Sequence, residues 1–576
     1  MKKGKLVVPP AVPDSTSVES EPATEKQNGR ATRRQFLSGT GMTVGVLGSG
    51  MLAPQSLVAQ TIASVHHDDD DPNRLVAAEG RKRAEQSFDV RTLAARREHQ
   101  QSLPDQYNNG DERRFLNRIG NYSKGLPHNA IGEVNPQAYG QFLTALESGK
   151  FSDLENIPLG GALKLQNPIA AFTFDLEGAD SHRLPIRVPP TVSSAETAGE
   201  MVELYWQALT RDVPFVNFDT DPITQAAAAD LSKLSDFRGP KVNGQVTTGT
   251  LFRADLPGVT TGPHISQFLL NTIPYGANSI PPQIRTVLPG IDYLTSFSDW
   301  LNIQNGALPV APNQFDPTPQ LIRTPRDIGE YVHRDFEFQA ALNAFLLLQS
   351  LRAPASPTNP YNLSKTQMPA ITFGAVFTPD MLDRAVNCGT RAAWYQKWAV
   401  HRRLRPEEMG GLIQNHKTGV ARAPLSNEIL NAAVLNLVAS RFGSFLLPMA
   451  FPEGCPSHPS YPAGHAVIIG ASVTILKALF DEAFVIPKPV MPSPDGKSLV
   501  PFIGTPLTVG GELNKLASNI ALARNGAGVH WRSDSVEGIN LGEKAAISLL
   551  QDMKLTLTEP FEGFSFTKFD GTSIVI

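Results

Sequence analysis

The sequence predicts a mainly α-helical protein with little β-sheet. Apolar residues recur at helical spacing in long segments without proline, and capping residues precede several of these segments. Residues 564–576 instead place β-prone side chains around an Asp-Gly turn, which predicts a small hairpin. The chain has 576 residues, of which 41% are hydrophobic, so it can bury a large core. No persuasive linker follows residue 80, and we predict one large helical domain over residues 81–576.

The predicted helices follow one another along the chain, joined by loops rich in proline and glycine. Proline at the first position opens one of them, and Ser193 and Glu196 stand at capping-box spacing at the start of another. Thr378-Pro379-Asp380 is a further start signal. The expected helices are 74–101, 136–146, 193–212, 224–234, 326–350, 378–404, 425–442, 466–480, 513–524 and 536–553.

The N-terminal residues resemble a twin-arginine export signal. Arg33 and Arg34 follow a polar leader and precede a weakly apolar, glycine-rich run. We expect leader and signal to occupy residues 1–60, and the protein to be exported to the periplasm or the medium. The alternative is a disordered basic tail. Residues 61–80 hold an acidic run, which predicts a solvated linker.

Composition excludes several classes of function. The net charge of −4 argues against general nucleic-acid binding. No apolar run after the signal is long and uncharged enough to span a membrane. Cys388 and Cys455 are too few for a disulfide framework or a thiolate metal site, and the sequence leaves open whether they pair.

Residues 451–471 predict a loop that leads into a buried helix. Four prolines keep the first part irregular, and a nearly continuous apolar run begins at Gly464. Gly464 and His465 then lie in the first helical turn, where free N–H groups and the helix dipole favour an anion. His465 is placed to exchange a proton with that anion. The alternative is a core helix with a capping histidine.

A basic segment ends another predicted helix. Lys397, His401 and Arg405 follow at intervals of four residues and share one helix face, and Pro406 ends the helix. Such an arginine can bind an oxyanion with both arms of its guanidinium while the lysine adds a point charge. The alternative is a solvated basic face beside Glu407 and Glu408.

A third segment places an arginine and a histidine on either side of a helix break. Arg524 ends an amphipathic helix, Gly526 and Gly528 break it, and His530 follows. The alternative is an arginine that merely stabilises the helix C-terminus. Together the three segments offer the cations, helix amides and imidazoles that a buried tetrahedral oxyanion requires. The chain has neither His-Glu-x-x-His nor the paired carboxylates of glycosidases.

These motifs resemble the acid phosphatase and vanadium haloperoxidase superfamily. Its signature is Lys-x6-Arg-Pro, then Pro-Ser-Gly-His, then Ser-Arg-x5-His. Seven residues separate Lys397 from Arg405 here, a spacing similar to that of the vanadium-dependent bromoperoxidases of algae and cyanobacteria. Further segments that look like this branch are NYSKGLPHN, FRADLPG, GPHISQFLL and RDIGEYVHRDF. The resemblance covers most of the chain from about residue 110.

The resemblance implies a helical-bundle domain of the haloperoxidase type with minor hairpins, and an active site within residues 390–535. His530 would be bonded to vanadium. The oxygens of the vanadate would be held by Lys397, Arg405, Arg524 and the N–H of Gly464.

The resemblance also implies roles for residues around the vanadate. His465 would be the acid–base group, His458 would lie near the halide, and Trp394 would lie near the cofactor. Ala463 departs from the family pattern, because a serine usually stands there and donates its hydroxyl to an oxygen of the vanadate. Loss of one such bond costs on the order of 1.5–3 kcal/mol.

The implied activity is oxidation of bromide or iodide by hydrogen peroxide, with vanadate as cofactor, to a hypohalous acid that halogenates organic acceptors. The resemblance further implies a homo-oligomer. One alternative is an acid phosphatase of the same superfamily with His530 as nucleophile. Another, of a different class, is a non-catalytic helical oligomer with a relict anion pocket.

Overall fold

A computed structural model describes residues 74–310 and 312–576 of the chain. The chain divides into two compact units, residues 1–81 and 82–576. Of the first unit, the structure describes only residues 74–81, which begin the first helix. The predicted export signal, residues 1–60, lies outside the described residues. So does the predicted linker, residues 61–80, apart from its last residues, which form the start of α1.

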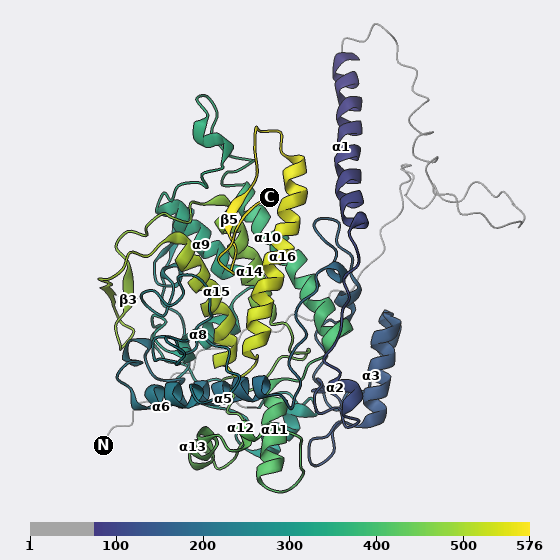
Figure 1. The fold of residues 1–576 in the computed structure, drawn as a ribbon, viewed down its shortest axis with the longest axis vertical. Coiled ribbons are helices and arrows are strands. Elements are labelled where there is room, and N and C mark those ends of the chain that lie inside the picture. Colours follow the sequence, from purple (N-terminus) through teal and green to yellow (C-terminus); the bar gives the residue numbers. More distant parts are fainter. Residues whose placement is uncertain (1–73, 311) are drawn as a thin grey trace, which may run out of the picture. The chain divides into compact units, whose positions relative to one another are not determined.

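Helices dominate the described chain (Figure 1). The α-helices are α1 (Arg74–Gln100), α2 (Asp111–Arg114), α3 (Pro136–Ser148), α4 (Phe151–Leu154), α5 (Ala195–Thr210), α6 (Pro222–Leu231), α7 (Phe297–Gln304), α8 (Pro325–Arg334), α9 (Gln339–Ser350), α10 (Phe377–Trp394), α11 (Pro406–Lys417), α12 (Asn427–Leu430), α13 (Ala433–Phe442), α14 (Gly464–Leu479), α15 (Val509–Gly526) and α16 (Arg532–Thr556).

Short helical turns and three antiparallel strand pairs complete the described fold. The 3₁₀ turns are η1 (Pro168–Phe172), η2 (Ser181–Arg183), η3 (Phe215–Asn217), η4 (Gln267–Leu269) and η5 (Pro360–Leu363), and η6 (Tyr395–His401) is a π-helical turn. The strands are β1 (Ile273–Tyr275) with β2 (Asn278–Ile280), β3 (Val490–Pro492) with β4 (Leu499–Pro501), and β5 (Ser565–Thr567) with β6 (Ser573–Val575). The last pair is the predicted C-terminal hairpin, which is confirmed.

Helix α14 lies at the centre of the largest hydrophobic core, between α10, α15 and α16 (Figure 1). Its residues from Ala466 to Leu479 are all buried, as expected for a helix that is apolar all round. Glycines bring α14 and α16 close together. A side chain at Gly542 would overlap the carbonyl oxygen of Val467, and one at Gly470 would overlap that of Ile539. This contact fixes the start of α14 against the start of α16.

Two of the predicted helices are interrupted near residues that form the candidate active site described below. The helix expected over 326–350 is two helices, because α8 ends at Arg334 and α9 begins at Gln339. The helix expected over 378–404 begins at Phe377 without a side-chain cap from Thr378, widens into η6 and ends at His401. Arg402 then adopts a left-handed backbone conformation with φ 44°. Asp335 follows the first interruption and Lys397 lies in the widened turn, so both breaks occur at polar residues of the site.

Smaller differences concern caps and helix length. The predicted helix over 425–442 is divided into α12 and α13. Ser194, rather than Ser193, caps α5 by accepting a hydrogen bond from the Thr197 N–H. The remaining predicted helices are present, with ends shifted by a few residues, as expected for pattern-based boundaries.

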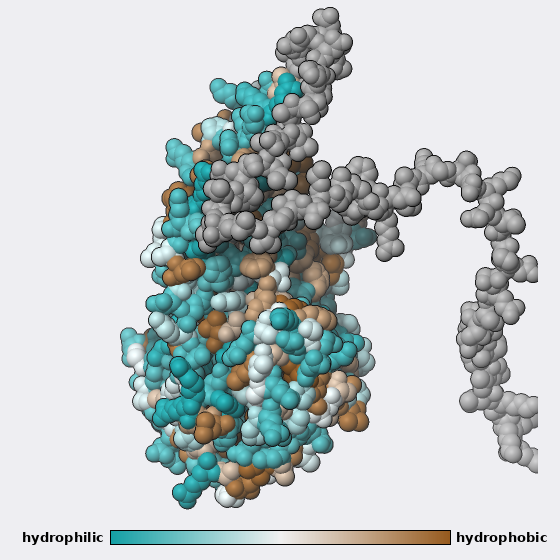
Figure 2. All heavy atoms as spheres, turned by 90° about the vertical axis from the view of Figure 1, so that its right-hand side faces the viewer, coloured by the Kyte–Doolittle hydropathy of each residue, from teal (hydrophilic) through white to brown (hydrophobic). Residues whose placement is uncertain are grey.

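The face of the molecule shown in Figure 2 is mostly hydrophilic, and hydrophobic residues occur on it in small separate groups. Among the described helices, none combines the length and the apolarity that crossing a membrane requires. Cys388 and Cys455 are both buried free thiols and do not pair with each other.

Candidate active site

Lys397 enters the site from the π-helical turn η6. A π-helical turn takes up one more residue than an α-helical turn and occurs often at functional sites. It overlaps the first half of the interval from Lys397 to Arg405, which is one residue longer than the spacing in the superfamily signature. The Lys397 ammonium group is fully buried and donates to the carbonyl oxygens of Pro459 and Ser460, both at 2.9 Å. Burial, followed by the charge of Arg405, holds the pKa of Lys397 well below its usual range.

Arg405 is the residue before α11, and its guanidinium is fully buried. Its Nε donates to the carbonyl oxygen of His458 at 2.9 Å, and one terminal nitrogen donates to that of Val529 at 2.7 Å. The same nitrogen lies 3.0 Å from Nε2 of His530. Arg405 therefore connects the loop before α14 to the loop before α16.

Arg524 lies in the last turn of α15 and reaches the site from a third direction. One terminal nitrogen donates to the carbonyl oxygen of Val332 at 2.8 Å, and its guanidinium lies 5.5 Å from the centre of the Phe451 ring. Its buried Nε has no hydrogen-bond partner among the described residues. Burial lowers the pKa of Arg524 to about 10.

His530 is held in one orientation by Asp534, four residues further on at the start of α16. Nδ1 of His530 donates to Asp534 Oδ2 at 2.8 Å, which leaves the Nε2 lone pair to accept from the Arg405 nitrogen 3.0 Å away. Burial, then the charges of Arg405 and Lys397, holds the pKa of His530 well below its usual range, so the ring is neutral. A neutral imidazole whose second nitrogen donates to a carboxylate is the arrangement found in metal-ligating histidines.

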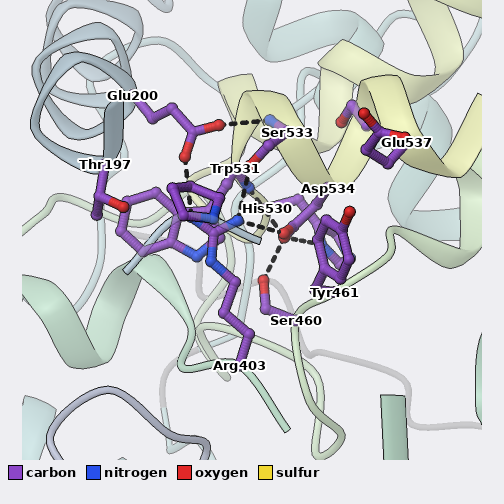
Figure 3. A network of polar contacts seen from close by, with 12 residues as sticks. Thr197, Glu200, Arg403, Ser460, Tyr461, His530, Trp531, Ser533, Asp534 and Glu537 are labelled. Carbon is purple, nitrogen blue, oxygen red and sulfur yellow. Dashed lines mark hydrogen bonds and ion pairs between the residues drawn. The ribbon is translucent and has the colours of Figure 1, made fainter. Parts of the chain in front are cut away.

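Asp534 is the hub of the polar network in Figure 3. Besides His530, its carboxylate accepts hydrogen bonds from Arg403 at 2.9 Å and from the hydroxyl of Ser460. Arg403 in turn pairs with Glu200 of α5 at 2.9 Å. The carbonyl oxygen of Asp534 accepts the N–H of Ala463 at 2.9 Å. Asp534 thus fixes His530 through its carboxylate and the start of α14 through its backbone carbonyl.

The first turn of α14 supplies backbone donors to the site. Ala463 is the N-cap residue, with no side-chain cap, and its methyl group is fully buried. Gly464 and His465 follow, and their N–H groups have no partner within the helix. The helix dipole adds positive potential at this end.

His465 is paired with Asp335, a residue that the sequence did not single out. Nε2 of His465 lies 3.0 Å from Asp335 Oδ1, and the side chain of His465 is 26% exposed. Asp335 follows the last residue of α8, so the break between α8 and α9 is what brings it into the site. His465 therefore has both a carboxylate partner and access to solvent.

His458 and Trp394 lie side by side at the edge of the site. Their ring centres are 5.1 Å apart, and the Trp394 ring centre is 6.0 Å from the ammonium of Lys397. A terminal nitrogen of Arg405 lies 3.0 Å from Nδ1 of His458. Burial, then the charges of Lys397 and Arg405, holds the pKa of His458 well below its usual range.

The site has the character of an anion pocket. Lys397, Arg405 and Arg524 are all buried, and among the described residues no carboxylate lies within ion-pair distance of any of them. Buried cations without a counter-charge are costly unless an anion compensates them. In the described chain no cluster of three His, Cys, Asp or Glu side chains could hold a metal cation. These residues fit a tetrahedral oxyanion of the vanadate type with one imidazole ligand.

Comparisons with known proteins show the family to which the chain belongs. Residues 381–558 match a family model described as the VCPO second helical-bundle domain. The chain is 35% identical to the vanadium-dependent bromoperoxidase of Ascophyllum nodosum over 537 residues, which covers 89% of this chain and 94% of that protein. It is 34% identical to the vanadium-dependent bromoperoxidase of Corallina pilulifera, with 86% of this chain and 98% of that protein covered. The chain belongs to the vanadium-dependent bromoperoxidase family.

A solved structure extends the likeness to the fold. The homohexameric second vanadate-dependent bromoperoxidase of Ascophyllum nodosum superposes with a TM-score of 0.82 at 32% sequence identity. The match covers 94% of this chain and 95% of that one. The predicted helical fold of the haloperoxidase type is confirmed.

The other eight predicted site residues gather around His530, whereas His401 does not join them. The expectation that His401 shares a face with Lys397 and Arg405 is wrong, because the helix widens and ends between them. The His401 ring lies 4.9 Å from that of Tyr461, and both its nitrogens are buried without partners. Burial lowers the pKa of His401 to about 3.

Sequence analysis missed the two aspartates that orient the histidines. Asp534 stands four residues after His530 in the first turn of a helix, and this spacing could have revealed it. Asp335 carried no comparable signal, because 130 residues separate it from His465.

Proposed function

We propose that the protein is a vanadate-dependent bromoperoxidase. It uses hydrogen peroxide to oxidise bromide or iodide to a hypohalous acid, which then halogenates organic acceptors. The observation that carries the proposal is a ring of three buried, uncompensated cations around the neutral, aspartate-oriented His530. Near-complete coverage of relatives named vanadium-dependent bromoperoxidases supports it.

Vanadate would be held by His530 through Nε2, with Lys397, Arg405, Arg524 and the first-turn N–H groups of α14 on its oxygens. When bound, vanadium(V) supplies a Lewis acid that activates peroxide toward attack by halide without a change in its oxidation state. The protein contributes fixed charge in a water-poor site, where each cation acts more strongly than it would in water.

His465 is the acid–base residue of this proposal. Its pairing with Asp335 fixes the ring while its partial exposure lets protons move to and from solvent. His458 and Trp394 form an aromatic edge beside Lys397, and we assign the halide to this edge.

The central experiment is reconstitution with vanadate. We expect the apo protein to have little bromination activity, to gain it when orthovanadate is added, and to lose that gain when phosphate competes, because phosphate has the same shape and a similar charge. The comparisons do not favour the acid phosphatase or the relict pocket. Rapid hydrolysis of phosphate esters by a protein that binds no vanadium would reverse this conclusion.

Two further parts of the proposal concern assembly and location. A homo-oligomer is supported by the homohexameric relative, and light scattering of the purified protein tests it. Export by the twin-arginine route rests on Arg33 and Arg34. Replacing both arginines by lysine should trap the protein in the cytoplasm, and unchanged export would contradict this assignment.

A further inference from the structure

His333 lies near the end of α8, and each of its two ring nitrogens is close to a carboxylate oxygen. Nδ1 lies 3.1 Å from Oε2 of Glu330, and Nε2 lies 2.6 Å from Oε1 of Glu453. Ionised carboxylates only accept hydrogen bonds, so both contacts are made when the ring carries both protons. His333 is therefore bound as an imidazolium, with its side chain 11% exposed.

The same ring is stacked on a residue that touches the active site. His333 and Phe451 are nearly parallel, with ring centres 3.7 Å apart and planes inclined by 9°. The guanidinium of Arg524 lies 5.5 Å from the centre of the Phe451 ring. Arg524 also donates to the carbonyl oxygen of Val332, the neighbour of His333. The end of α8 thus supports Arg524 through both a carbonyl and a stacked ring.

Glu453 links α8 to the loop that contains Phe451. It stands two residues after Phe451, and its backbone carbonyl accepts a hydrogen bond from the buried Lys124 at 2.7 Å. The bond from His333 to Glu453 therefore ties the loop to α8. Without the imidazolium, one carboxylate loses its donor and the loop loses this tie, so Phe451 is less firmly held against Arg524.

The charged groups facing His333 come from each element around it. Glu330 lies on α8 and is also 3.4 Å from Arg334, Glu453 comes from the loop, and Arg524 comes from α15 across Phe451. Burial works to lower the pKa of His333, but the hydrogen bonds to Glu330 and Glu453 outweigh it, so the pKa is raised. Arg524 also feels the charge of Glu453.

We propose that Glu330, His333 and Glu453 form a lock that positions Arg524 for the oxyanion, and that the lock is closed when His333 is protonated. These are positioning residues, because they act on the oxyanion through Phe451 and Arg524. The inference rests on the proposed function in that vanadate is the anion used as a probe.

The pH dependence follows from the sign of the shift. A group with a raised pKa in the folded protein contributes fully below its ordinary pKa, and the contribution is lost as pH rises through the raised value. The lock is therefore closed below the ordinary imidazole pKa of about 6.5 and opens as pH rises through the raised pKa of His333. A cation stacked on an aromatic ring is worth up to about tenfold in an equilibrium constant.

The test is the dissociation constant of vanadate, measured by equilibrium dialysis across pH for wild type and His333→Phe. Phenylalanine keeps the stack on Phe451 and removes the proton. Vanadate changes its own protonation over this range, so the ratio between the two proteins is the quantity used. We expect His333→Phe to bind vanadate about three- to tenfold more weakly below about pH 6.5, with a ratio that falls toward one as pH rises through the raised pKa of His333. A ratio that does not vary with pH overturns the lock.

Two further proteins sharpen the comparison. Glu453→Gln changes a side chain that is 39% exposed, and it should move the transition to lower pH, because it removes one of the carboxylates that raise the pKa of His333. Glu337→Gln removes an exposed carboxylate just beyond α8 that takes no part in the lock, and it should match wild type at every pH. An unchanged transition in Glu453→Gln, or an equal shift in Glu337→Gln, contradicts the assignment.

A measurement on the apo protein separates this inference from the proposed function. Histidine-labelled protein should show by NMR that His333 titrates above about 6.5, the usual imidazole value. Titration at or below that value overturns the lock. If wild type binds no vanadate at any pH, the proposed function fails while this titration still decides whether His333 is held as an imidazolium.

Discussion

The site contains two histidine–aspartate pairs that share their chemistry and differ in their surroundings. His530 and Asp534 lie 2.8 Å apart at the start of one helix, and both side chains are almost fully buried, at 3% and 0% exposed. His465 and Asp335 lie 3.0 Å apart and come from distant parts of the chain, and His465 is 26% exposed. One pair is sealed among cations and the other is open to water.

The difference in burial suits the two histidines to the different roles that we propose for them. In the sealed pair, burial and the nearby cations hold the pKa of His530 well below its usual range, which suits the ligand role that we propose for its Nε2 lone pair. In the open pair, solvent contact permits exchange of protons, which acid–base catalysis requires. A carboxylate orients the ring in both, so exposure rather than the partner separates the roles.

The largest expected effect comes from removing each imidazole in turn. His530→Ala should abolish vanadium binding and bromination together, because the imidazole ligand is lost. His465→Ala should retain vanadium and lose turnover by about a hundredfold or more, the usual contribution of a positioned acid–base group. Metal analysis and a bromination assay on both variants measure this. If His530→Ala retains full vanadium and the full bromination rate, His530 is not the ligand.

Removing the carboxylate that orients each histidine should give the same difference between the two pairs, with smaller effects. Asp534→Asn should weaken vanadate binding about ten- to a hundredfold, the usual cost of losing such an outer-shell partner. Asp335→Asn should leave vanadate affinity near that of wild type and change the pH profile of turnover. Equal losses of affinity in both variants would show that the two pairs do not differ in role.

A third histidine tests where the halide lies. His458→Phe should change the ratio of bromide to iodide oxidation while vanadate stays bound, because His458 stands beside Trp394 at the edge of the site. Dialysis and halide-dependent kinetics decide this. Complete loss of the cofactor would instead assign His458 to the vanadate pocket itself.

The smallest expected effect is at Ala463. Ala463→Ser adds a hydroxyl at the N-cap of α14, where Ala463 provides no side-chain cap. We expect vanadate affinity or bromide turnover to rise about tenfold, because a hydrogen bond to a charged group contributes on the order of 1.5–3 kcal/mol, of which we take the lower end. If neither quantity changes, another donor already fills this role.

Sequence patterns predicted the helices and the cationic residues because both leave local signals. The apolar run after Gly464 predicted α14. The motifs that hold the cations and His530 lie within or next to the helices that place these side chains in the site, namely Lys397, Arg405, Arg524 and His530. Asp335 escaped prediction because its partner is distant in sequence and because the break after Arg334 has no proline or glycine to announce it. His401 was misplaced because periodicity assumes a regular helix, and η6 is not one.

The central claim is that His530 is a neutral ligand fixed by Asp534, and NMR of the apo protein with ¹⁵N-labelled histidine tests it most directly. We expect His530 to keep its proton on Nδ1 and to remain neutral around pH 6.5, where an ordinary imidazole titrates, because burial and the charges of Arg405 and Lys397 hold its pKa well below the usual range. A proton on Nε2, or titration near about 6.5, would contradict it.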